Sequence, residues 1–280
     1  MFSISKETAW CPGCGNFGIL EALKEALEAL NLEPHQVVIS SGIGQAAKTP
    51  QYISANMYNG LHGRSLPAGI GIKLANKGLT VIVESGDGCS YGEGGNHFLH
   101  AVRRNLDITH LVHNNQVYGL TKGQASPTTA RQQKTELQFD GVQMEPLNPL
   151  ALALSLGAGF VARGFFADKK QLSALIAEAV AYRGYALVDI LQTCPTFNKV
   201  NTFKWYKDRV YYLAADYDPS DIAQAHLKAL EWGERMPLGV IYKREKAEYA
   251  THNPVVRANP PLVDLPLNPT HAKRFMDDFR

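Results

Sequence analysis

The chain has few cysteines, no long apolar run and no block of charge of one sign. Its 280 residues include four cysteines and carry a formal net charge of +2, so composition gives no reason to expect a disulfide scaffold or a nucleic-acid-binding surface. No apolar stretch approaches the roughly 20 residues of a membrane span, and residues 1–7 lack the apolar core of a signal peptide. We therefore expect a cytoplasmic protein that binds neither nucleic acid nor membrane.

Strand-like and helix-like segments alternate along the chain. Apolar runs predict strands at 36–41, 79–85, 108–113, 160–162 and 186–191. Helical spacing of apolar residues, together with the room needed for crossovers, predicts helices at 16–31, 67–76, 94–104, 169–183 and 220–232. This alternation favours an α/β fold with a mainly parallel sheet and helices on both faces. We expect residues 1–250 to form this domain, and the Pro-rich segment 251–280 to be an extended tail that contacts a partner.

A carboxylate and an amide follow two of the predicted strands. Gly86-Asp87-Gly88 comes directly after the run 79–85, and Asn115 follows the run 108–113. The 25 residues between Gly88 and Asn114 are enough for a crossover helix, so both groups should lie at the carboxyl ends of parallel strands, where ligands of α/β sheets bind. Magnesium prefers oxygen ligands and usually keeps phosphate oxygens among them. We predict a magnesium site made by Asp87, Asn115 and the carbonyl of Val117.

The spacing of these motifs, and the segments around them, resemble a known family. The Gly-Asp-Gly to Asn-Asn spacing is similar to that of thiamine diphosphate enzymes. Further segments resemble the β subunit of 2-oxoacid:ferredoxin oxidoreductases: WCPGCGN at 10–16, HGR at 62–64, GGNHF at 94–98, NQVYGLTKGQ at 115–124 and CPTFN at 194–198. The resemblance implies a thiamine diphosphate-binding fold. It also implies a set of cofactor contacts: Gly44, His62, Gly86, Asp87, Gly88, Asn115, Val117, Gly119, Leu120 and Thr121.

The same resemblance implies an activity and partners. The family carries out coenzyme A-dependent oxidative decarboxylation of a 2-oxoacid and passes the electrons to ferredoxin. We find no segment that resembles the family's pyrimidine-binding domain, so the glutamate that activates the cofactor is expected on a separate α subunit, and a γ subunit can complete the assembly. The chain alone should be inactive. The HGR context slightly favours 2-oxoglutarate as the substrate.

The four cysteines leave several interpretations open. Cys11 and Cys14 form a C-x-x-C motif, but a thioredoxin-like site should lie near a βαβ unit and a zinc ribbon needs a second close pair. The resemblance implies a [4Fe-4S] cluster, which is usually held by four thiolates, with Cys11, Cys14 and Cys194 in ligand positions. Where many relatives have the fourth cysteine, this chain has Gln45. Cys89 is either that fourth ligand or a small buried residue beside the cofactor.

His62 and Arg64 lie in a glycine-bounded turn before a predicted helix. A helix N-terminus with cationic and imidazole donors suits a diphosphate or a substrate carboxylate, so we predict a catalytic or cofactor-contacting role for both. The alternative is that His62 caps the helix and Arg64 is a solvated surface residue. Nicotinamide binding is disfavoured, because no Asp or Glu lies between Glu33 and Glu84 to hold a ribose hydroxyl.

Two other functions remain as alternatives. The chain could be half of a non-oxidative thiamine-dependent 2-oxoacid decarboxylase, which would contain no iron and release an aldehyde. It could also be a non-catalytic electron-transfer or redox-regulatory subunit that uses only its cysteines, which would not bind magnesium and thiamine diphosphate.

Overall fold

An eight-stranded sheet organises the molecule. The computed structural model describes residues 1–266 and 269–279, and gives the side chains of these residues except those of Pro269, His271 and Phe275. The strand order is β2-β1-β3-β4-β8-β7-β10-β9. The bounds are β1 Val37–Ser41, β2 Asn56–Asn59, β3 Thr80–Gly86, β4 Ile108–Asn114, β7 Phe160–Phe165, β8 Tyr185–Leu191, β9 Val210–Tyr212 and β10 Met236–Lys243. Strands from β2 to β7 in this order pair in parallel, whereas β10 runs antiparallel to β7.

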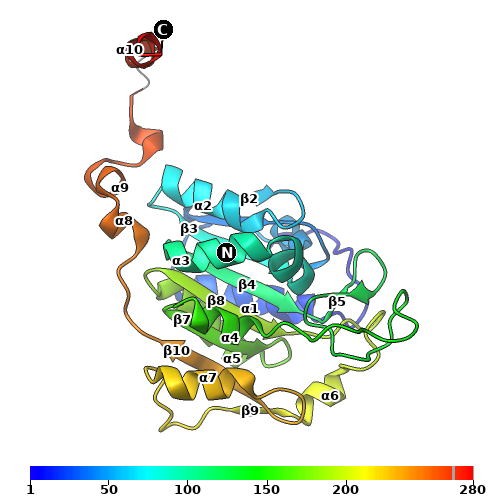
Figure 1. The fold of residues 1–280 in the computed structure, drawn as a ribbon. Coiled ribbons are helices and arrows are strands. Elements are labelled where there is room, and N and C mark those ends of the chain that lie inside the picture. Colours follow the sequence, from blue (N-terminus) through cyan, green and yellow to red (C-terminus); the bar gives the residue numbers. More distant parts are fainter. Residues whose placement is uncertain (267–268, 280) are drawn as a thin grey trace.

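Helices cover both faces of the sheet (Figure 1). One face packs on α1 (Asn16–Ala29) and α5 (Lys169–Ala181). The other packs on α2 (Ser65–Ala75), α3 (Gly95–Arg104), α4 (Pro149–Ser155) and α7 (Ile222–Leu230). The central strands are buried on both sides: Leu111 of β4 belongs to one apolar core and its neighbour Val112 to the other. The predicted α/β fold with a mainly parallel, doubly covered sheet is therefore confirmed.

Most of the predicted elements begin and end within two residues of their predicted bounds. The strand predicted at 160–162 is longer and continues to Phe165 as β7. The prediction missed β2, α4, β9 and β10. β10 carries Pro237 near its start, and such a residue argues against a central strand when only the sequence is read.

Short turns and helices at the carboxyl ends of the strands position the site. They are η2 (Ala46–Tyr52), η3 (Gly88–Glu93), the small hairpin of β5 (Val117–Tyr118) and β6 (Gln124–Ala125), and α6 (Phe203–Lys207). A further short turn, η1 (Pro34–Gln36), leads into β1. Figure 1 shows the arrowhead of β4 directed toward β5, so this small hairpin closes one side of that edge.

The prediction of an extended C-terminal tail is wrong. The segment forms α8 (Tyr249–His252), α9 (Pro254–Ala258), η4 (Leu262–Asp264) and α10 (Pro269–Asp277), and it leads away from the sheet in Figure 1. Proline starts α9 and α10, where its missing N–H costs nothing, and the Asn253 side chain caps α9. Lys77 Nζ donates to the carbonyls of Val256, at 3.1 Å, and Asn259, at 2.8 Å. Residues 267, 268 and 280 of the predicted tail lie outside the described residues.

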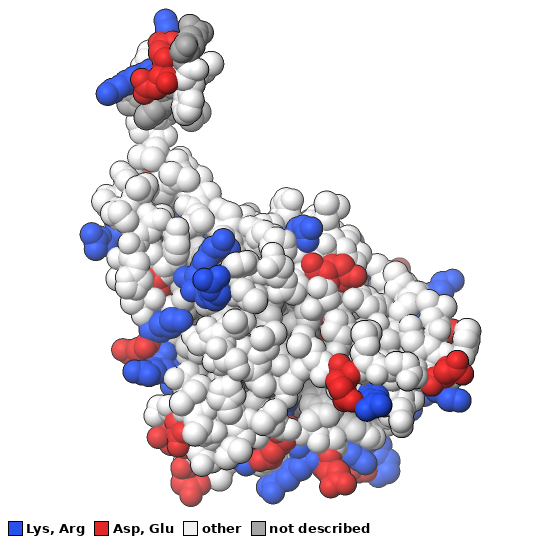
Figure 2. All heavy atoms as spheres, viewed as in Figure 1, with Lys and Arg blue, Asp and Glu red and all other residues white. Residues whose placement is uncertain are grey.

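The surface is charged without a dominant sign. Figure 2 shows acidic and basic side chains interspersed, mostly around the rim of the visible face, in keeping with a net charge of +2. Within the part of the chain that the structure describes, no helix is both long and apolar enough to cross a membrane.

Candidate active site

A pocket lies at the carboxyl ends of β3 and β4, which pair in parallel with Gly86 opposite His113. All ten residues predicted to contact the cofactor line this pocket, although they come from four separate segments of the chain. The lining comprises Ile43, Gly44, Gln45, Ala46, His62, Gly86, Asp87, Gly88, Cys89, Asn115, Val117, Tyr118, Gly119, Leu120 and Thr121. The structure thus brings the predicted residues together at one place, while their contact with a cofactor stays a prediction.

Glycines let the backbone approach closely around Asp87. A Cβ at Gly88 would lie 2.2 Å from Cε1 of Tyr118, so only glycine fits directly after the aspartate. Gly44 has φ of +134°, a conformation that favours glycine. Both positions leave backbone at the pocket wall, where a large anionic group needs close approach and few side chains.

The Asp87 carboxylate is buried and held by two hydroxyl groups. Ser126 Oγ lies 2.5 Å and Thr128 Oγ1 lies 2.7 Å from its Oδ2. Burial raises the pKa of Asp87 to about 6, and these two hydrogen bonds offset that rise only in part. Since a nearby cation favours the charged form of a carboxylate, a metal ion at this oxygen pair would restore the ionised state.

Ser126 and Thr128 were not predicted. They lie in the long segment between β6 and α4, which returns to the strand ends only in the folded molecule. Thr128 Oγ1 also lies 2.9 Å from Asn114 Oδ1, and the Asn114 amide donates to the buried Asp189 carboxylate at 3.2 Å. A polar residue pair flanking Pro127 was the one sequence signal available, and it is common in ordinary turns.

Asn115 and Val117 form a tight turn after β4. Asn115 Oδ1 accepts the N–H of Val117 at 3.0 Å, and the residue between them, Gln116, has φ of +60°. The Asn198 side chain donates to the Asn115 carbonyl at 3.0 Å, and Thr129 Oγ1 donates to the Gln116 carbonyl at 2.6 Å. These bonds fix the turn that carries two of the three predicted metal ligands.

His62 and Arg64 differ in their placement. His62 lines the pocket and its Nδ1 lies 3.1 Å from Glu93 Oε2, close enough for an ion pair but without the geometry of a hydrogen bond. Tyr118 Oη donates to the same Glu93 oxygen at 3.1 Å. Arg64 is exposed, lies outside the pocket lining and donates to the Gly63 carbonyl at 3.5 Å. The geometry therefore supports a site role for His62 and gives none to Arg64.

Three of the four cysteines form a group beside the pocket. A turn places Cys14 N 3.0 Å from the Cys11 carbonyl. A Cβ at Gly119, in the pocket wall, would lie 3.6 Å from Cys194 Sγ. Burial, with smaller contributions from the nearby Cys194 and Cys11 thiols, raises the pKa of Cys14 to about 11. Among the described residues, no three His, Cys, Asp or Glu side chains lie close enough to hold a single metal ion.

Burial and nearby backbone N–H groups act on the Cys194 thiol in opposite directions. The N–H groups of Phe197, Asn198 and Thr196 favour its thiolate, although burial is the larger effect and raises the Cys194 pKa. A desolvated thiol stays protonated unless a metal compensates the charge of the thiolate.

Cys89 occupies a different environment. Its buried sulfur accepts the N–H of Gly63 at 3.2 Å, and a Cβ at Gly42 would lie 2.4 Å from it. The thiol thus packs between two glycine turns at the pocket wall, which favours the interpretation as a small buried residue over that of a fourth cluster ligand.

Two family models match the chain. The C-terminal TPP-binding domain of thiamine pyrophosphate enzymes matches residues 35–190, which include both strand ends and the pocket. The C-terminal region of the pyruvate ferredoxin oxidoreductase β subunit matches residues 194–258. The chain therefore has the fold of a thiamine diphosphate-binding domain.

Similar proteins narrow the class. The 2-oxoacid:ferredoxin oxidoreductase β subunit of Saccharolobus solfataricus is 46% identical over 274 residues, 91% of this chain and 90% of the relative. The 2-oxoglutarate oxidoreductase subunit KorB of Mycobacterium tuberculosis is 42% identical over 70% of this chain and 53% of the relative. A solved structure of 2-oxoglutarate:ferredoxin oxidoreductase from Magnetococcus marinus, with 2-oxoglutarate, coenzyme A and succinyl-CoA bound, superposes with a TM-score of 0.89 at 35% identity and covers 92% of this chain and 88% of that chain. The chain belongs to the β subunits of 2-oxoacid:ferredoxin oxidoreductases, as its motifs predicted, and is thus a subunit of an oxidoreductase.

Proposed function

We propose that this β subunit binds thiamine diphosphate through magnesium at the pocket and serves the coenzyme A-dependent oxidative decarboxylation of a 2-oxoacid, with ferredoxin as electron acceptor. The observation that carries the proposal is the buried Asp87 carboxylate, which shares a pocket wall with Asn115 and Val117. When bound, thiamine diphosphate supplies the electron sink for decarboxylation.

The donor set suits magnesium. Asp87 offers a carboxylate, Asn115 an amide oxygen and Val117 a carbonyl, and such hard oxygen donors leave positions for phosphate oxygens. The hydroxyl groups of Ser126 and Thr128 hold Asp87 Oδ2, so the carboxylate is oriented before any cation arrives. His62, at the same wall, is placed to contact the diphosphate or the substrate.

The three grouped cysteines suit an iron-sulfur cluster. Cys11, Cys14 and Cys194 supply thiolates, and one [4Fe-4S] cluster would give the electrons a route from the pocket toward ferredoxin. The position of a fourth ligand is taken by Gln45, whose Oε1 is buried without a hydrogen-bond partner. A buried oxygen without a donor or a metal ion is unfavourable.

A separate α subunit should complete the site. Two apolar side chains of the pocket lining are exposed, Leu120 at 41% and Ile43 at 36%, and Leu61, next to His62 in the chain, is 76% exposed. Apolar patches of this kind mark interaction surfaces. Their position beside the pocket supports a partner that covers the cofactor and brings the activating glutamate, with a γ subunit as a further component.

The substrate is 2-oxoglutarate in this proposal. Support comes from the similarity to the Magnetococcus marinus enzyme, which was solved with 2-oxoglutarate, and to the M. tuberculosis 2-oxoglutarate oxidoreductase subunit. Other relatives carry the broader 2-oxoacid name, so the decisive comparison is turnover of 2-oxoglutarate against pyruvate by the same complex.

The test is a composition and turnover assay of the complex co-purified with its α subunit. We expect thiamine diphosphate, magnesium, iron and sulfide, coenzyme A-dependent reduction of ferredoxin, and no turnover by the β subunit alone. Aldehyde release without iron would instead establish the non-oxidative decarboxylase. Iron without binding of thiamine diphosphate would establish an electron-transfer subunit.

A further inference from the structure

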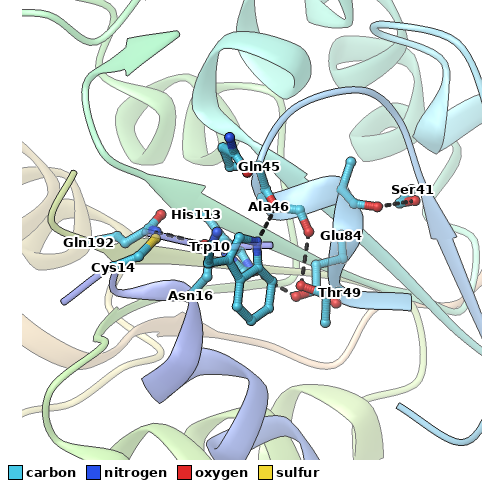
Figure 3. A network of polar contacts seen from close by, with 11 residues as sticks. Trp10, Cys14, Asn16, Ser41, Gln45, Ala46, Thr49, Glu84, His113 and Gln192 are labelled. Atoms are coloured by element: carbon cyan, nitrogen blue, oxygen red, sulfur yellow. Dashed lines mark hydrogen bonds and ion pairs between the residues drawn. The ribbon is translucent and has the colours of Figure 1, made fainter. Parts of the chain in front are cut away.

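Four polar side chains form a buried row that starts at Cys14 and ends inside the sheet (Figure 3). Gln192 Nε2 lies 3.7 Å from Cys14 Sγ and 2.6 Å from Asn16 Oδ1. His113 Nδ1 lies 2.8 Å from the same Asn16 oxygen, and His113 Nε2 lies 2.7 Å from Glu84 Oε1. All four side chains are at most 1% exposed. The row thus runs from α1 and the end of β8 to the middle of β3 and β4.

The acceptors in this row fix where its protons lie. An amide oxygen only accepts, so Asn16 Oδ1 takes one hydrogen from His113 Nδ1 and one from Gln192 Nε2. His113 Nε2 contacts Glu84 Oε1 at 2.7 Å, so the imidazole ring is held at both of its nitrogens. The second N–H of the Gln192 amide remains, and it is directed at Cys14 Sγ. The Gln192 amide thus donates a hydrogen bond to the sulfur, and Asn16, His113 and Glu84 fix the orientation of this amide.

Gly15 provides the space that the Gln192 side chain occupies beside Cys14. A Cβ at that position would lie 2.4 Å from Cγ of Gln192, so any other residue directly after the C-x-x-C motif would displace the glutamine. Gly15 N also donates to the carbonyl of Thr193, next to Gln192, at 3.3 Å. The backbone that carries Cys14 and the one that carries Gln192 are therefore tied together.

This row of polar side chains lowers the stability of the fold. Asn16 Nδ2, Gln192 Oε1 and Glu84 Oε2 are buried without a hydrogen-bond partner, and such groups destabilise a fold relative to apolar packing. A hydrogen-bond donor on a cysteine sulfur, in contrast, is one of the features by which proteins set the potential of iron-sulfur centres.

We propose that Gln192 is a positioning residue for the cysteine site, which donates an N–H to Cys14 Sγ and favours the one-electron reduced state of the cluster, while Asn16, His113 and Glu84 hold its amide in that orientation. The inference rests on the proposed cluster at Cys11, Cys14 and Cys194. The reduced cluster carries one more negative charge on its sulfur ligands, so a donor to Sγ stabilises it more than the oxidised cluster.

The experiment compares Gln192→Met with Gln192→His in the αβ complex. Methionine keeps the length of the side chain and removes both donors, whereas histidine changes the shape and keeps an N–H. Gln171→Met, on α5 and outside the row, is the matched control. The midpoint potential is measured by reductive titration followed by electron paramagnetic resonance, with iron and sulfide analysed on the same samples.

We expect Gln192→Met to lower the equilibrium constant for one-electron reduction of the cluster about tenfold, which is a shift of its midpoint potential by about 59 mV to lower values. The shift should be smaller in Gln192→His and absent in Gln171→Met. Loss of the cluster from the methionine variant with retention in the histidine variant also supports a donor role. Equal potentials in all variants, a larger shift in histidine than in methionine, or loss of the cluster from both would overturn the inference. If the wild-type complex contained thiamine diphosphate but no iron, the proposed cluster would be excluded and the proposed thiamine diphosphate site would be unaffected.

Discussion

The pocket and the cysteine site lie side by side, but they are built in different ways. The pocket is formed by turns that directly follow β3 and β4, and its key carboxylate is buried with two hydroxyl groups on one oxygen. The cysteine site joins a loop before α1 to a loop after β8, 180 residues apart from Cys14 to Cys194, and the Gln192 amide from that second loop donates to Cys14 Sγ. In a site made by strand ends, the hydrogen bonds of the sheet fix the positions of the side chains. In a site made by loops, these positions depend on the contacts between the loops.

This contrast predicts that each site can be removed without the other. Asp87→Asn should weaken magnesium-dependent binding of thiamine diphosphate by at least about 100-fold, because it removes the anionic ligand, while iron stays with the complex. Calorimetric titration of the complex with thiamine diphosphate and magnesium measures the effect. Asp140→Asn, in an exposed loop, is the control. Unchanged affinity in Asp87→Asn would exclude this carboxylate from the metal site.

Loss of a cysteine ligand should remove the iron and leave the binding of thiamine diphosphate intact. Cys194→Ser is expected to lose most of the iron and sulfide while thiamine diphosphate binding changes less than about twofold, because the hydroxyl is a poor ligand for iron. Cys89→Ser is the matched control, since its sulfur contacts glycine turns at the pocket wall. Iron retained in Cys194→Ser and lost in Cys89→Ser would reverse the ligand assignment.

The two sites also differ in how far the sequence predicts them. Asp87, Asn115 and their neighbours follow apolar runs whose ends meet at one sheet edge, so a local pattern places them. Ser126 and Thr128 return to the same edge from a long loop, and no local pattern encodes that return. The row from Gln192 to Glu84 likewise joins segments whose contact exists only in the folded molecule.

Errors in the fold prediction have similar causes. The antiparallel strand β10 was missed because Pro237 interrupts its strand pattern, although parallel pairing with β9 places it near an edge of the sheet. The tail was predicted to be extended because it is rich in proline, yet proline at the first position of a helix is favourable when Asn253 provides the cap. Composition alone does not distinguish these two uses of proline.

The buried Asp87 carboxylate makes the stability of the cofactor-free protein depend on pH. The pKa of Asp87 is raised by burial from its usual 3.8 to about 6, so the cofactor-free folded state binds this proton more tightly than the unfolded state does. Its stabilising contribution is complete below about pH 4 and is lost as pH rises through about 6, up to about 3 kcal/mol. Urea unfolding from pH 4 to 7.5 measures this contribution as the difference in slope between the cofactor-free wild-type protein and Asp87→Asn, because buried His110, whose pKa burial lowers to about 3, contributes to the slope of both. Equal slopes in the two proteins would contradict it.

The smallest expected effect tests whether the hydroxyl groups behind Asp87 prepare the pocket for a cation. Thr128→Val keeps the shape of the side chain and removes the oxygen that lies 2.7 Å from Asp87 Oδ2 and 2.9 Å from Asn114 Oδ1. A lost hydrogen bond to a charged group is worth about 1.5 kcal/mol, so the magnesium requirement for thiamine diphosphate binding should rise about tenfold. Thr251→Val, at an exposed position of α8 outside the pocket, should change it less than about twofold. If the two valine variants behaved alike, orientation of Asp87 by Thr128 would contribute nothing, and burial in the sheet edge would alone position the carboxylate.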